Sequence, residues 1–126
     1  MNISGWLLQT ARISPDAPAI RFGADLHVTY SEFAQHSAGM AQYLSETLGV
    51  TKGDRVALFM RNRPEYLEVL HAVLWLGAIV VPINYKRRGS SAMPKHLLSL
   101  PKRAVSFLTR PIWRANALNA ECMILV

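Results

Sequence analysis

The sequence contains one cysteine, Cys122, among its 126 residues. A single cysteine excludes an internal disulfide and a metal site built on several thiolates. The first residues also lack the positively charged start and the long apolar run of a secretory signal. A chain without disulfides or a signal fits the reducing cytosol, so we expect a cytoplasmic protein.

Long hydrophobic runs are scarce. The most apolar stretch, residues 69–83, includes His71 and Pro82. A membrane-spanning helix needs roughly 20 consecutive apolar residues. The stretch therefore favours two buried elements in succession over a transmembrane helix.

Acidic residues are almost absent from the last third of the chain. Residues 1–85 hold six Lys or Arg and seven Asp or Glu, whereas residues 86–126 hold eight Lys or Arg and only Glu121. The net charge of +6 thus belongs to one segment. Because the positive charge is local, nucleic acid and membranes are unlikely partners for the whole chain.

The N-terminal third predicts a helix, a hairpin and a second helix. Apolar residues at helical spacing favour a helix over residues 3–13, ended by the prolines of 14–18. Residues 19–30 form two short β-branched and aromatic runs around a glycine, which is typical of a hairpin. Residues 33–48 again have helical spacing, with either Thr29 or Ser31 as the N-cap.

A strand, a helix and a strand follow. Residues 55–60 are a compact apolar run, and residues 62–65 offer an N-cap and a first-turn proline. The apolar helix over residues 66–76 ends at Gly77, and residues 78–83 are rich in β-branched side chains. This order predicts a βαβ unit of a parallel sheet and an α/β fold.

The pattern ends after Tyr85. Prolines 94, 101 and 111 interrupt a segment without sustained periodicity. We therefore divide the chain into a folded portion, residues 1–86, and a basic, proline-broken tail, residues 87–126, which we expect to be poorly ordered and foreign to the fold.

Catalytic and metal-binding patterns are missing. The four histidines share no metal-ligand spacing, and no Gly-x-Ser-x-Gly motif occurs. His71 lies among apolar residues, which favours packing over ligation. Glu65 and Glu68 fit the start of a helix, where negative charge is favourable. We expect no catalytic residue and no metal site.

Six short segments occur in one order over about two thirds of the chain. Each alone is ordinary turn or cap chemistry, but their order is specific. The segments are Ile3-Ser-Gly-Trp-Leu-Leu8, Ser14-Pro-Asp-Ala-Pro-Ala19, Thr29-Tyr-Ser-Glu-Phe33, Lys52-Gly-Asp-Arg-Val56, Asn62-Arg-Pro-Glu-Tyr66 and Leu76-Gly-Ala-Ile-Val-Val-Pro-Ile-Asn84. Together they resemble the start of the adenylate-forming superfamily, which includes the AMP-forming acyl-CoA synthetases.

The resemblance implies the incomplete N-terminal part of the adenylate-forming domain. A full-length member uses ATP, Mg²⁺ and coenzyme A to convert a carboxylic acid, through an acyl-adenylate, into a thioester. This chain lacks the Tyr-Gly-x-Thr-Glu segment and the C-terminal subdomain with its catalytic lysine. We expect a truncated member without activity of its own and without a cofactor in this chain.

Two lysines are candidate cofactor-binding residues. The segment Gly89-Ser-Ser-Ala-Met-Pro-Lys95 resembles the family's phosphate loop, but Ala92 replaces a glycine and the segment comes too early. Lys86 follows the Pro-x-Asn strand, where some coenzyme A ligases have a basic residue. A solvated loop lysine is the alternative in both cases.

A different class of function is also open. Residues 1–86 would then be a scaffold, and the basic tail would contact anionic lipid or nucleic acid. The scattered bases and sparse aromatic residues of the tail weigh against this non-catalytic binding protein.

Overall fold

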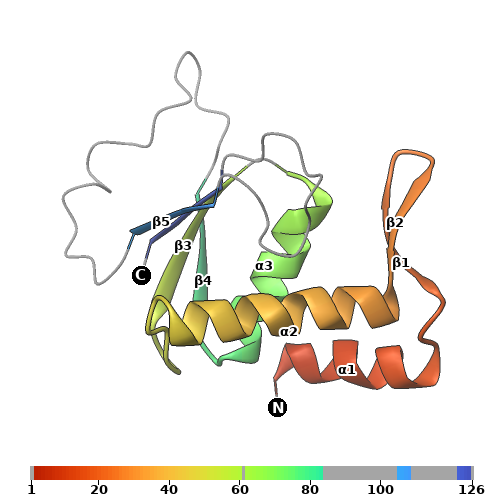
Figure 1. Ribbon diagram of the computed structural model, residues 1–126, viewed down its shortest axis with the longest axis horizontal. Helices are drawn as coiled ribbons and strands as arrows, with labels where there is room; N and C mark the ends of the chain where they lie inside the picture. Colours follow the sequence, from red (N-terminus) through yellow and green to blue (C-terminus); the bar gives the residue numbers. More distant parts are fainter. Residues whose placement is uncertain (1, 61, 84–104, 109–121, 126) are drawn as a thin grey trace.

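The computed structural model describes residues 2–60, 62–83, 105–108 and 122–125 (Figure 1). Helices and strands alternate, which confirms the predicted α/β class. The elements are α1 (Ile3–Ile13), β1 (Pro18–Phe22), β2 (Asp25–Thr29), α2 (Tyr30–Glu46), β3 (Arg55–Met60), α3 (Pro64–Trp75), β4 (Ile79–Ile83), β5 (Val105–Leu108) and β6 (Cys122–Leu125).

The N-terminal elements follow the prediction closely. The side chain of Asn2 caps α1 by accepting a hydrogen bond from the Ser4 amide at 3.1 Å. Strands β1 and β2 form the expected antiparallel hairpin, and Gly23 between them has a φ of 66°. Glycine adopts this left-handed conformation without a steric penalty, so the chain can reverse tightly at this point.

A capping box starts α2. The Thr29 amide donates to Oε2 of Glu32 at 2.8 Å, and the Glu32 amide donates to Oγ1 of Thr29 at 3.4 Å. Two amide groups that would otherwise lack partners are thereby satisfied. Of the two N-caps that the sequence left open, the structure selects Thr29.

Strand β3, helix α3 and strand β4 form the predicted βαβ unit. The two strands are parallel, with Arg55 opposite Ile79 and Phe59 opposite Ile83. Helix α3 has Pro64 in its first turn, but its N-cap is Arg63, without a side-chain hydrogen bond. Both the N-cap and the first-turn proline thus lie within residues 62–65, as the sequence predicts.

Two further strands come from the segment after residue 86. Strand β6 pairs antiparallel with β3, and β5 pairs antiparallel with β6. The four-stranded sheet therefore has the order β4-β3-β6-β5. Part of the segment that the sequence assigned to a tail thus pairs with the sheet, while the boundary at residue 86 stays a prediction.

The larger core lies between α2, α3 and one face of β3. Every second residue of β3, namely Val56, Leu58 and Met60, points into this core. A smaller core joins α1, the hairpin and the start of α2 (Figure 1). Its buried members are Leu7, Ile20, Val28, Phe33 and Ala34.

Candidate functional site

The two lysines that the sequence singled out, Lys86 and Lys95, lie outside the described residues. Within the described ranges, no group of three or more His, Cys, Asp or Glu side chains is placed to hold a metal ion. In the same part of the chain, no helix combines the length and apolar character that crossing a membrane requires.

Ionisable side chains meet instead where α2 crosses α3. Nδ1 of His36 on α2 lies 2.8 Å from Oε1 of Glu68 on α3. Ser37 follows His36 on α2, and Glu65 lies one helical turn before Glu68; both are buried. With His71, one turn further along α3, these side chains form what we call the polar seam: His36, Ser37, Glu65, Glu68 and His71.

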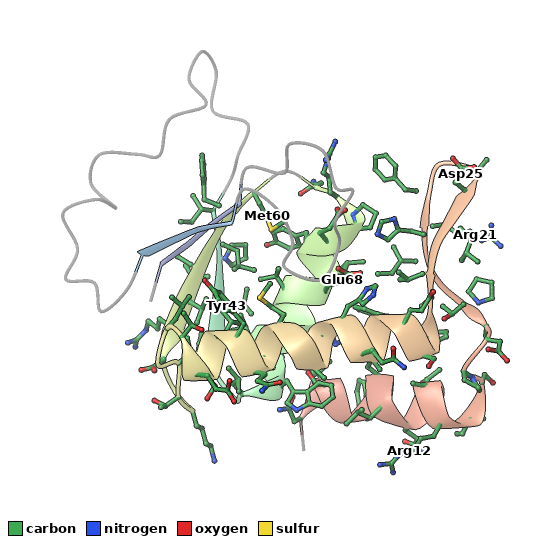
Figure 2. All side chains as sticks on the ribbon, in the orientation of Figure 1. Arg12, Arg21, Asp25, Tyr43, Met60 and Glu68 are labelled. Carbon is green, nitrogen blue, oxygen red and sulfur yellow. The ribbon has the colours of Figure 1, made fainter. Side chains whose placement is uncertain are left out.

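Glu68 is the most deeply buried ionisable group of the polar seam. None of its side chain is exposed, whereas 20% of the His36 side chain is. A carboxylate removed from water is costly unless it is paired and hydrogen-bonded. The His36 contact supplies such a partner, and Figure 2 shows Glu68 on α3 beside the crossing with α2.

His71 makes the second contact between the two helices. Its ring packs edge-on against the Phe33 ring of α2, with centroids 4.9 Å apart and planes at 74°. Burial lowers the pKa of His71, because the imidazolium form would lose its hydration. This environment agrees with the interpretation of His71 as a packing residue.

Three polar atoms of the seam are buried without a hydrogen-bond partner among the described residues. They are Oγ of Ser37, Oε2 of Glu65 and Nδ1 of His71. Buried polar atoms are usually paired with protein groups or ordered water. The seam is therefore a polar interruption of an otherwise apolar interface.

The polar seam lies apart from two open grooves of the described surface. One groove, of about 350 Å³, runs between β1 and the start of α3 and is lined by Ile20, Phe22 and Leu67 among others. Arg21 borders it, but its side chain points away from α3 (Figure 2). The other groove, of about 520 Å³, lies beside Lys52 at the end of α3. Neither groove includes a residue of the seam.

The sequence alone gives no reason to group the members of the polar seam. From the sequence, Glu68 fits the charge preference of a helix start, whereas the structure pairs Glu68 with His36. A signal was present, since His36 is three residues after Phe33 and therefore on the apolar face of its helix. Only the crossing of α2 and α3 brings these positions together.

Known proteins resemble the first two thirds of the chain. The family model described as "AMP-binding enzyme" matches residues 7–99. A feruloyl-CoA synthase of Amycolatopsis is 40% identical over 85 residues, which are 68% of this chain and 17% of that protein. A 2-succinylbenzoate–CoA ligase of Bacillus velezensis is 38% identical over 81 residues, 64% of this chain and 16% of the ligase.

Solved structures agree with these relatives. A Mycobacterium tuberculosis fatty acyl CoA synthetase matches with a TM-score of 0.62 and 37% identity, covering 68% of this chain and 17% of that chain. The N-terminal subdomain of Klebsiella oxytoca NpsA, in complex with 3-hydroxyanthranilyl-AMSN, matches with a TM-score of 0.64 and 26% identity. That match covers 77% of this chain and 23% of the subdomain.

The family match over residues 7–99 includes most of α1, the hairpin, α2 and the βαβ unit described above. The chain spans about 17% of the length of the curated relatives. These findings do not favour the alternative of a binding protein with a basic tail. The family model covers well over half of the sequence, and the chain belongs to the AMP-binding enzyme family of adenylate-forming proteins.

Proposed function

We propose that this chain provides the opening elements of an AMP-forming acid–thiol ligase and has no ligase activity by itself. The observation that carries the proposal is the family match over residues 7–99 together with the small share of each relative, about 17%, that the chain spans. The polar seam joins α2 to α3, and its residues pack and pair within the interface. Its role in the proposed function is to position these elements.

The reaction proposed for a complete member has two steps. A carboxylate oxygen attacks the α-phosphorus of ATP, and pyrophosphate leaves as the acyl-adenylate forms. A thiol then attacks the acyl carbon, and AMP leaves as the thioester forms. Charge neutralisation at the phosphates and positioning of the reactants lower both barriers.

The names of the relatives suggest aromatic or fatty carboxylic acids as substrates and coenzyme A as the acceptor. For a complete member we propose ATP and Mg²⁺ as further requirements. Lys86 and Lys95 are the candidate phosphate contacts of this chain, because both are basic and follow the strand β4.

ATP–pyrophosphate exchange tests this function directly. The purified chain is incubated with Mg²⁺, labelled pyrophosphate and a panel of aromatic and fatty acids. We expect exchange at the level of a reaction without protein. Exchange that disappears in Lys95→Ala, but persists in the matched variant Lys102→Ala, would refute the proposal and identify a minimal adenylating unit.

A further inference from the structure

We propose that the polar seam is an acid-sensitive contact, which holds α2 against α3 while His71 is neutral and loosens when His71 binds a proton. The device is independent of the proposed ligase function, since it concerns only the packing of two helices. The crossing lies beside both cores, since α2 contributes Phe33 to the smaller core and Met40 to the larger one.

Two side-chain contacts across the crossing differ in character. His36 and Glu68 form a polar contact of 2.8 Å, whereas Phe33 and His71 form a ring contact of 4.9 Å. The ring contact needs no charge on His71. A proton added to the imidazole would place a charge on a ring that this contact partly buries.

One ring nitrogen of His71 has no acceptor in place for an added proton among the described residues. Its Nδ1 is buried and has no hydrogen-bond partner in the described portion of the chain. From α1, Ser4 approaches only the main-chain oxygen of His71, to which its hydroxyl donates at 2.9 Å. Partial burial of the ring therefore disfavours its charged form.

Other ionisable groups face the same interface. Helix α2 contributes His36, and α3 contributes Glu65 and Glu68. The contribution of His71 must therefore be isolated as the difference between the natural chain and a variant at this one position.

The sign of the effect follows from the lowered pKa of His71. An unfolded chain binds this proton near the ordinary histidine pKa of about 6.5. As the pH falls below this value, the unfolded state is protonated first and the folded state loses stability. The contribution is fully present above about pH 6.5 and is lost as the pH falls through the folded pKa.

Urea unfolding of the full chain between pH 8 and pH 5 measures this contribution. The variant His71→Phe keeps a ring in contact with Phe33 but has no imidazole to bind a proton. We therefore expect its stability to lack the part of the pH dependence that comes from His71. Relative to this variant, the folding equilibrium constant of the natural chain should fall by up to about tenfold per pH unit below pH 6.5. As a control, the same difference should remain when both proteins also carry His27→Gln, a change on β2 outside the polar seam.

A second measurement keeps the test decisive if His71→Phe folds poorly. The imidazole protons of His71 are followed by NMR through the same pH range, with hydrogen exchange of the α2 and α3 amides. We expect a pKa below the ordinary value and faster exchange in both helices on protonation. A pKa at or above the ordinary value, or parallel stability curves for the natural chain and His71→Phe, would overturn the proposal.

Discussion

Single residues set the ends of the elements, and Gly77 is the clearest case. It follows α3 with a φ of 70°, a left-handed conformation that side chains with a Cβ rarely adopt. Its carbonyl accepts a hydrogen bond from the Gly53 amide at 3.0 Å, so the conformation also fixes the turn before β3. The glycine thus connects the end of the helix to the entry of the strand.

We expect Gly77→Ala to lower the free energy of unfolding by about 1–2 kcal/mol, because of backbone strain. A Cβ at this position would also lie 3.1 Å from Cγ of Lys52, although that exposed side chain can move. Urea unfolding monitored by circular dichroism measures the change. A stability equal to that of the natural chain would contradict the argument.

Gly39 offers the matched control. It lies inside α2, has no positive φ, and a Cβ there would meet no atom within 4 Å. Because glycine costs a helix interior up to about 1 kcal/mol relative to alanine, Gly39→Ala should stabilise the protein by a similar amount. The same substitution is thus expected to act in opposite directions at the two glycines.

At the scale of elements, the start of α2 depends on its capping box. We expect Thr29→Ala to destabilise the protein by about 1 kcal/mol, since the hydroxyl that accepts from the Glu32 amide is lost. Thermal unfolding measures the effect. Thr10→Ala is the control, because Thr10 lies inside α1 and its hydroxyl only donates to the Trp6 carbonyl. Equal losses in the two variants would argue against a capping role.

Most elements of the first 83 residues could be predicted from the sequence, for local reasons. Three signals act over only a few residues and can be read directly from the sequence. They are the helical spacing, the glycine between β1 and β2, and the proline of α3. For α3 the sequence narrows the N-cap only to residues 62–65, and residue preference within that range favours asparagine over arginine. The structure places the boundary at Arg63.

The polar seam could not be predicted in the same way. Its contacts join residues that lie far apart in the sequence. His36 and Glu68 are separated by 32 positions, and Phe33 and His71 by 38. Periodicity shows which face of a helix is buried but does not show which residue of another helix lies opposite. The pairing of β6 with β3 is equally nonlocal, and a basic, proline-broken segment gave little reason to expect it.

At the scale of the whole molecule, the larger core makes the described elements interdependent. Its buried members come from α2, β3, α3 and the turns beside them, so no one of these elements is packed alone. Leu58 of β3 is fully buried at this junction. Val81, on the neighbouring strand β4, is 37% exposed.

We therefore expect Leu58→Ala to lower the free energy of unfolding by about 2–5 kcal/mol, through lost burial and a cavity. Val81→Ala removes a smaller, partly hydrated side chain and should cost well under half as much. Domains of this size are stabilised by only about 5–15 kcal/mol, so Leu58→Ala removes a large share. Hydrogen exchange distinguishes a cooperative core from separate units: the amides of α2, β3 and α3 should lose protection together in Leu58→Ala. Loss confined to β3 would mean that the helices are held mainly by their own contacts, including the polar seam.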